Sequence, residues 1–311
     1  MKHIKHFVFV LMAEFATAFT ACSQPTRIDV RAEVYDPDGQ PVESATVVLG
    51  APRYRMGEKD VKTEAQTDKK GIAELSVQAE TDYALAVSKP GYYRTVGPHR
   101  SIATPTQATK YATGTQVVRL ELRPIRNPLR GVTRVVYRSP LPGFGKSAGF
   151  DLLVGDWVAP FGKGSVADFI FTLTGYVRSQ QDFDENLSLA FSQIGDGIMV
   201  FKAPPNSGSV FKFPYDAPLD DYLLTRAWRN AYDGKTRRLD NDLSRETNYI
   251  FRVRSERDGK GNVIRALYGV IVDEIEVLGT NETGFNITFC YRLNPDYTRN
   301  LEFDPPEVAT R

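Results

Sequence analysis

The chain has 311 residues, of which 41% are hydrophobic, and this length predicts about two domains with a core in each. Its 39 lysines and arginines balance 38 aspartates and glutamates, so no positive excess exists to neutralise phosphates, and we expect no nucleic-acid partner. The histidines are His3, His6 and His99, and the first two fall in the leader described below. A mature two-histidine zinc site is therefore excluded, and we predict neither a metal nor a cofactor.

The first 21 residues have the order of a secretory signal, with charge first, then an apolar run, then small residues. Lys2 and Lys5 precede an apolar run from Phe7 to Ala13, a single Glu14, and a mostly apolar stretch from Phe15 to Ala21. A transmembrane helix needs about 20 predominantly apolar residues, and no segment of the sequence reaches that length. We therefore expect the body of the protein to be exported and soluble.

The sequence Phe19-Thr20-Ala21-Cys22 resembles the lipobox of bacterial lipoproteins, although leucine is usual in place of Phe19. The resemblance implies a signal peptide over 1–21, lipidation of Cys22 and a tether over 22–26. Ser23, where an aspartate would retain the protein at the inner membrane, implies an anchor in the outer membrane. The alternative is ordinary cleavage after Ala16-Thr17-Ala18, which would allow Cys22 and Cys290 to form a disulfide.

Residues 27–124 have the pattern of short strands separated by turns. Ile28, Val30, Ala32 and Val34 alternate with charged residues, which predicts a strand with one buried face. Residues 36–39 and 68–71 predict turns, because both contain aspartate and end in a glycine that accepts a positive φ. Further strands are predicted over 63–67, 72–77, 83–87 and 117–120. Strands this short and closely spaced indicate a small β-sandwich.

These residues resemble the carboxypeptidase regulatory-like domain, a transthyretin-like β-sandwich grouped with carbohydrate-binding-like folds. The residues that carry the resemblance are Val34, Asp38-Gly39, Pro41-Val42, Ala45, Val47, Thr67-Asp68, Gly71, Tyr83, Leu85, Val87 and Lys89-Pro90-Gly91-Tyr92. The resemblance implies the fold and an accessory role in a secreted bacterial protein. It implies no catalytic residue, because the family shares none.

A basic stretch follows the predicted sandwich. Its arginines recur every three or four residues, at positions 119, 123, 126, 130, 134 and 138. Pro124, Pro128 and Gly131 exclude the helix that this spacing would otherwise suggest. We predict a solvated basic linker over 125–142, with some arginines paired locally. Contact with anionic lipopolysaccharide or lipid is the alternative.

Residues 143–311 are predicted to form a second β-rich domain with at most one or two short helices, so the whole chain is mainly β. We predict a strand over 169–173, a hairpin that turns at 258–262, and a strand over 285–291 with Cys290 on the face opposite the aromatics. Leu219, Tyr222, Leu223, Ala227 and Ala231 follow a helical stripe between Asp216 and Gly234. This stripe predicts one helix, with an irregular loop as the alternative.

Trp157 and Asp156 are the predicted ligand-binding residues. Loop-forming residues surround Trp157, so among the aromatics it is a candidate for an exposed ring that stacks on a sugar. Asp156 beside it would accept hydrogen bonds from hydroxyl groups. The alternative is that Trp157 is a core residue, as most aromatics in β-rich domains are. Balanced charge and scarce histidine favour a neutral glycan over a charged metabolite.

Two acidic groups are candidates for further sites. Asp182, Asp184, Glu185 and Asn186 have the spacing that opens a calcium loop, but Leu187 replaces the required glycine, so we predict a solvated loop. Asp273, Glu274 and Glu276 are candidates for the carboxylate pair of a glycosidase. An exposed acidic strand face is the alternative for this second group.

The sequence contains no catalytic motif, so we expect a non-catalytic, lipid-anchored envelope protein with a structural or ligand-binding accessory role. The membrane is its expected partner, together with a glycan or another envelope protein. One alternative is a carbohydrate-binding accessory protein of a saccharide-uptake system, which clustered exposed aromatics would favour. The other is a hydrolase of the C-terminal domain, which two carboxylates converging in a cleft would favour.

Overall fold

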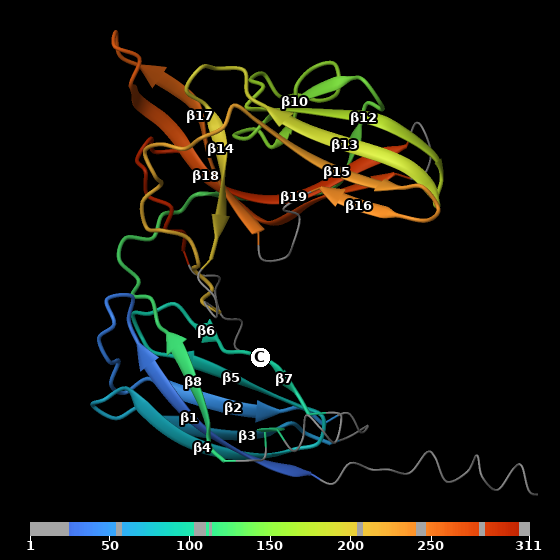
Figure 1. The fold of residues 1–311 in the computed structure, drawn as a ribbon. Coiled ribbons are helices and arrows are strands. Elements are labelled where there is room, and N and C mark those ends of the chain that lie inside the picture. Colours follow the sequence, from blue (N-terminus) through green and yellow to red (C-terminus); the bar gives the residue numbers. More distant parts are fainter. Residues whose placement is uncertain are drawn as a thin grey trace, which may run out of the picture. The chain divides into compact units, whose positions relative to one another are not determined.

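A computed structural model describes residues 25–53, 58–102, 110–111, 114–203, 208–240, 247–279 and 284–304. The chain divides into two compact units, which we call the N-terminal and C-terminal units. The first comprises Met1–Pro124 with Asn206–Val210, and the second comprises Ile125–Pro205 with Phe211–Arg311. Both units are built from β-strands (Figure 1), which confirms the mainly β fold class.

The N-terminal unit contains two sheets. Its strands are β1 (Thr26–Tyr35), β2 (Thr46–Ala51), β3 (Val61–Gln66), β4 (Ile72–Ala79), β5 (Asp82–Ser88), β6 (Thr95–Val96), β7 (Arg100–Ser101) and β8 (Gln116–Glu121). One sheet has the order β4-β1-β8, and the other has the order β3-β2-β5-β6 with β7 paired to β5. Strands β1 and β8 run parallel, and the other pairs are antiparallel.

Strict alternation of side chains builds the core of this unit. Ile28, Val30, Ala32 and Val34 are at most 2% exposed and pack in one cluster with residues of the second sheet, which confirms the predicted buried face of β1. Both predicted turns are present. Asp68 Oδ1 accepts hydrogen bonds from the backbone of Lys70 and Ile72. Gly71 has a φ of +73°, and a Cβ there would lie 2.3 Å from the carbonyl oxygen of Val34.

A short segment from much later in the chain completes the edge of the second sheet. Val96 N donates to the carbonyl oxygen of Gly208, and Val210 N donates to that of Arg94, each over 2.8–3.0 Å. Thr95 and Ser209 form the β-bridge between these two bonds. The N-terminal unit is therefore not continuous in sequence.

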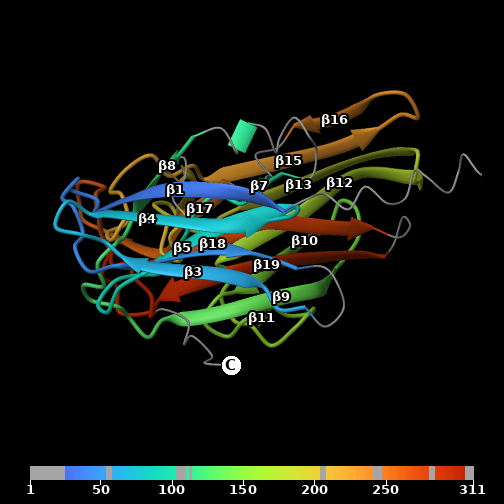
Figure 2. The ribbon, with the colours of Figure 1, turned by 90° about the horizontal axis from the view of Figure 1, so that it is seen from below.

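The C-terminal unit is a sandwich of two larger sheets. Its strands are β9 (Val132–Leu141), β10 (Ser147–Asp151), β11 (Asp156–Trp157), β12 (Phe169–Ser179), β13 (Asp182–Ala190), β14 (Gly197–Lys202), β15 (Thr225–Tyr232), β16 (Arg237–Asp240), β17 (Thr247–Arg257), β18 (Val263–Gly279) and β19 (Phe285–Asn294). The six-stranded sheet has the order β11-β10-β12-β13-β15-β16, and the five-stranded sheet has the order β14-β17-β18-β19-β9. Figures 1 and 2 both show β12, β13 and β15 side by side.

Aromatic side chains from both sheets fill the space between them. Phe169 on β12 packs edge-on to Phe251 on β17 with ring centroids 4.9 Å apart, and Phe171 packs against Phe289 on β19 at 5.5 Å. The predicted hairpin and the predicted strand over 285–291 are present as β17–β18 and β19. Cys290 lies on the face opposite these aromatics and is half-buried.

Two predictions for this unit are wrong. The stretch 125–142 is not only a linker, because β9 pairs with β19 along most of its length and forms an edge of the five-stranded sheet. The predicted helix over 216–234 is absent, because residues 225–232 form β15 between β13 and β16. Pairing of β9 with β19 and of β15 with β13, each distant in sequence, determined the backbone conformation. Residues 217–224 are irregular, as the alternative of a loop predicted.

Candidate functional site

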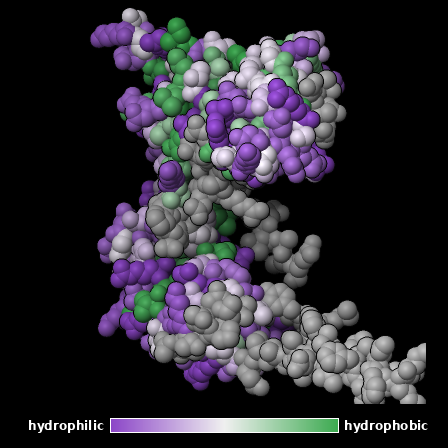
Figure 3. Space-filling model, turned by 45° about the vertical axis from the view of Figure 1, so that its right-hand side comes forward, coloured by the Kyte–Doolittle hydropathy of each residue, from purple (hydrophilic) through white to green (hydrophobic). Residues whose placement is uncertain are grey.

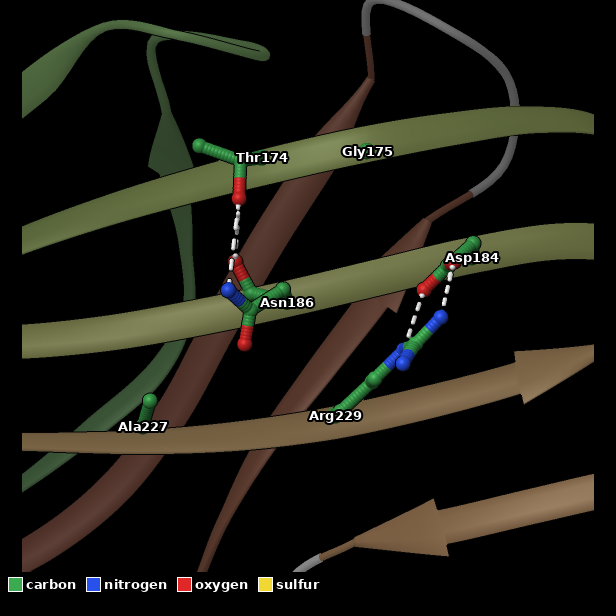
Figure 4. Close-up of a pocket in the computed structure, with 6 residues that line it drawn as sticks. All are labelled: Thr174, Gly175, Asp184, Asn186, Ala227 and Arg229. Carbon is green, nitrogen blue, oxygen red and sulfur yellow. Dashed lines mark hydrogen bonds and ion pairs between the residues drawn. The ribbon is translucent and has the colours of Figure 1, made fainter.

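A shallow pocket lies on the outward face of the six-stranded sheet. It has a volume of about 430 Å³ and is lined by Thr174, Gly175, Asp184, Asn186, Ala227 and Arg229 (Figure 4). These residues come from three neighbouring strands, β12, β13 and β15. We call this pocket the sheet-face groove. Hydrophilic side chains predominate on the face of the C-terminal unit, at the top of Figure 3, that is turned toward the viewer.

Strand alternation explains why these polar residues face outward. The chain neighbours Leu173, Leu187 and Trp228 are only 1–3% exposed and belong to the core. Because successive side chains on a strand point to opposite faces, Thr174, Asn186 and Arg229 point away from the core. The register places these three in one row across the sheet, with Thr174 opposite Asn186 and Asn186 opposite Arg229.

Asp184 and Arg229 form a two-bond fork in the groove. Arg229 Nε donates to Asp184 Oδ1 at 2.9 Å, and Arg229 Nη2 donates to Asp184 Oδ2 at 2.6 Å. These bonds hold the pKa of Asp184 below its usual value, against an opposing effect of desolvation. The carboxylate is therefore ionised at neutral pH, and the fork as a whole carries no net charge. A guanidinium and a carboxylate together supply both donors and acceptors to a ligand.

Thr174 and Asn186 contact each other only weakly. Thr174 Oγ1 donates to the carbonyl oxygen of Asn186 at 3.4 Å, and Asn186 Nδ2 donates to Thr174 Oγ1 at 3.5 Å. Both distances exceed the usual range for such bonds. A ligand hydroxyl can therefore replace these contacts at little energetic cost.

The floor of the groove is low because two of its residues have little or no side chain. Gly175 has a φ of +118°, and a Cβ there would lie 1.8 Å from the carbonyl oxygen of Asp184, so no larger residue fits. Ala227 is exposed and presents only a methyl group. A flat ligand can consequently approach the sheet closely between the polar side chains.

Trp157 lies in the core, contrary to the expectation of an exposed stacking ring. It is 4% exposed, and its Nε1 donates to Ser139 Oγ at 2.6 Å. Its ring packs edge-on to Phe150 and Phe171, with centroids 5.2 and 6.1 Å apart. The reason is that β11 pairs with β10 and turns the ring inward, although loop-forming residues surround it in sequence. In this structure the ring offers no face to a sugar.

Asp156 stabilises a local turn and does not line the groove. Its Oδ1 accepts from the backbone of Trp157 at 2.8 Å, and its Oδ2 accepts from the backbone of Lys163 at 2.9 Å. The structure therefore does not bring Asp156 or Trp157 to the groove residues. Cys22, the predicted lipidation site, lies outside the described residues.

The arginines of the basic stretch contact nearby partners. Arg119 pairs with Glu33 at 3.0 Å, and the guanidinium of Arg126 stacks 4.0 Å from the ring centroid of Tyr215. Arg138 lies over the ring of Tyr137 at 5.4 Å. The contact of Arg138 with Tyr137 agrees with the predicted local pairing, whereas Glu33 and Tyr215 are distant in sequence from the arginines that they contact.

The two acidic groups have different places in the structure. Residues 182–186 begin β13 and do not form the predicted solvated loop, because they pair with β12 and β15, and Asp184 and Asn186 of this group line the groove. Glu276 is exposed on β18, and the side chains of Asp273 and Glu274 lie outside the described ones. Glu185 faces the interior, where burial raises its pKa. Among the six described residues that line the groove, the one with a carboxylate is Asp184. Over the described ranges, no group of three histidine, cysteine or acidic side chains is placed to hold a metal ion.

Asp151, Asp168 and Arg254 form a buried charge network that the sequence did not predict. Asp151 and Asp168 are 1% exposed, and Arg254 donates to both over 2.8–2.9 Å. Asp151 also accepts from the backbone of Ser165 and Val166 at 3.1 Å. The network ties the connection between β10 and β12 to β17, so its role is structural. Arg254 lies 86 and 103 residues from its partners in sequence, and no local pattern signals such pairs.

Comparison with protein-family models finds no match, and comparison with curated proteins finds none either. Among solved structures, a point variant of the shaft pilin spaA from Lactobacillus rhamnosus GG is 12% identical, with a TM-score of 0.24, over 75% of this chain and 89% of that chain. A provisionally assigned carbohydrate-binding protein from Bacteroides uniformis ATCC 8492 is 11% identical, with a TM-score of 0.20, over 84% and 97% of the two chains.

A third similar structure is 3-chlorocatechol 1,2-dioxygenase from Rhodococcus opacus 1CP. It is 10% identical with a TM-score of 0.24, and the match covers 32% of this chain and 60% of that chain. Similarities at these scores are distant and carry no argument about function.

The described part of the chain holds no helix with the length and apolar character needed to span a bilayer.

Proposed function

We propose that this chain is a non-catalytic, ligand-binding accessory lipoprotein of the bacterial cell envelope, and that the sheet-face groove binds a neutral glycan. The observation that supports the proposal is the composition of the groove. A neutral Asp184–Arg229 fork, the amide of Asn186 and the hydroxyl of Thr174 surround a floor without long side chains.

The chemistry of these groups matches that of sugar hydroxyls. Each hydroxyl both donates and accepts a hydrogen bond, and so do the fork, the amide and the threonine together. The ionised carboxylate of Asp184 would repel an anionic ligand, whereas it would accept hydrogen bonds from a neutral one. The groove is open and shallow, so the expected binding is weak and reversible.

In this proposal the N-terminal unit is a spacer or docking module of the carboxypeptidase regulatory-like type. Lipid on Cys22 anchors the chain to the outer membrane, and the C-terminal unit holds the ligand. Several acyl chains on one cysteine suffice for a stable anchor. A role beside a saccharide-uptake system fits this arrangement, because such a system benefits from a weak glycan receptor at the surface.

A glycan array probed with the Cys22→Ser form of the protein tests the proposal. We expect a neutral glycan to bind, and we expect Asn186→Ala to weaken that binding about tenfold, the equivalent of 1.4 kcal/mol. Asn286→Ala is the matched control, because Asn286 lies on β19 in the other sheet. The proposal is wrong if no glycan binds. It is also wrong if Asn186→Ala binds the glycan as tightly as Asn286→Ala and the parent protein do.

A further inference from the structure

A row of hydroxyl groups continues the polar face beyond one side of the groove. Ser147 on β10 lies opposite Thr172 on β12, and Thr172 lies opposite Ser188 on β13. Ser147 Oγ and Thr172 Oγ1 share a hydrogen bond of 2.7 Å, and Ser188 Oγ donates to the carbonyl oxygen of Thr172 at 3.2 Å. Each hydroxyl has one donor and two acceptor positions, so these contacts leave the row able to bind further hydroxyls.

An exposed aromatic ring lies beyond the other side of the groove. Tyr176 on β12 is 37% exposed, and the register places it opposite Asp184. The guanidinium of Arg178 lies over its ring at 4.6 Å from the centroid, and Arg178 Nη1 is 3.4 Å from Asp182 Oδ2. Arg178 thus holds the ring in place, which lowers the entropic cost of using it as a stacking surface.

These features form three successive rows along β12 and β13. The first row contains Thr172 and Ser188, the second contains Thr174 and Asn186, and the third contains Tyr176 and Asp184. Residues two apart on a strand are about 7 Å apart, so the three rows span about 14 Å. A sugar ring in a chain is nearly as long as one such interval.

We infer that the sheet-face groove is the middle of a longer binding face, which takes an extended oligosaccharide of about three sugar units laid along β12 and β13. This inference rests on the glycan proposal above and adds the length and orientation of the ligand. The hydroxyl row and the groove bind the polar edges of two rings. Tyr176 packs against the apolar face of the third, which requires a ring whose hydroxyls are mostly equatorial.

The test is a length series on one array. It carries glucan, mannan, xylan and chitin oligosaccharides of one to six units, and it is probed with the Cys22→Ser protein. We expect the signal in the bound series to rise steeply up to the trimer and to level off beyond it. A monosaccharide that binds as tightly as its trimer overturns the length inference but leaves the glycan proposal standing. Absence of binding in every series overturns both.

Two variants test whether the oligosaccharide lies along β12 and β13. Tyr176→Ala should weaken trimer binding about tenfold and leave the weak binding of the monosaccharide unchanged. Its matched control is Tyr137→Ala, because Tyr137 is also an exposed tyrosine with an arginine over its ring but lies on β9 in the other sheet. Thr172→Val should also weaken trimer binding, and Thr133→Val on β9 should not. Equal trimer binding by Tyr176→Ala and the parent overturns the inference.

Discussion

Trp157 stabilises the C-terminal unit in two ways at once. Its ring fills space between Phe150 and Phe171, and its indole N–H donates to Ser139. Removing a buried tryptophan side chain leaves a cavity and costs about 3–5 kcal/mol. We therefore expect Trp157→Ala to lower the free energy of unfolding by about that amount in urea denaturation of the Cys22→Ser protein.

Two variants separate packing from hydrogen bonding at this position. Ser139→Ala removes only the acceptor of the indole N–H and should cost about 1–3 kcal/mol, because it leaves a buried donor without its partner. Tyr137→Ala alters a tyrosine that is 69% exposed on the same strand and should change stability by less than about 0.5 kcal/mol. A Trp157→Ala protein as stable as the Tyr137→Ala protein would contradict the core assignment.

At the scale of elements, β15 shows why a helical stripe is ambiguous. Two members of the stripe, Leu219 and Leu223, are 62% and 51% exposed, so the stripe does not form one buried face. Within 225–232, Trp228 and Ala231 face the interior and the groove side, respectively, as strand alternation requires. Pairing with β13 on one side and β16 on the other satisfies the backbone of β15 and allows Trp228 to be buried between the sheets.

The edge strand β9 shows a related effect in the basic stretch. Pro128 and Gly131 precede the strand, so the features that exclude a helix do not exclude this pairing. Near its end the register with β19 shifts between Ile287 and Phe289, and Arg138 there has a φ of +47°. A bulge of this kind interrupts the regular edge and discourages pairing with another chain.

In the whole molecule, a segment from much later in the chain adds two backbone hydrogen bonds to the N-terminal unit. We expect a protein of residues 27–124 alone to unfold cooperatively, because both sheets and the core lie within that span. It lacks Gly208–Val210, and the loss of those two backbone hydrogen bonds should cost about 1–3 kcal/mol. Urea denaturation followed by circular dichroism measures the cooperativity of unfolding. Comparison with the same unit in the whole protein gives the loss in free energy of unfolding. A spectrum without a cooperative transition would contradict the independence of this unit.

The anchor concerns the whole chain. We expect Cys22→Ser to move the protein from the membrane fraction to the soluble fraction and to abolish metabolic labelling with palmitate. The Cys290→Ser variant is the control and should leave both the fractionation and the palmitate labelling unchanged, because only Cys22 carries the lipid in this proposal. Membrane association by Cys22→Ser, with no palmitate in the parent, would contradict lipidation.

Local sequence patterns were sufficient to predict the β class, the turns and the inward face of the regular strands. Alternation in β1 and β19, and aspartate followed by glycine at residues 36–39, 68–71 and 258–261, act within a few residues and are therefore legible in the chain. The tertiary structure alone decided which aromatics are core and which polar residues share a face. Asp184 meets Arg229 across 45 residues, and Asp168 meets Arg254 across 86, because the register of paired strands brings them together. That register is fixed by the packing of two whole sheets against each other, which no local stretch of sequence encodes.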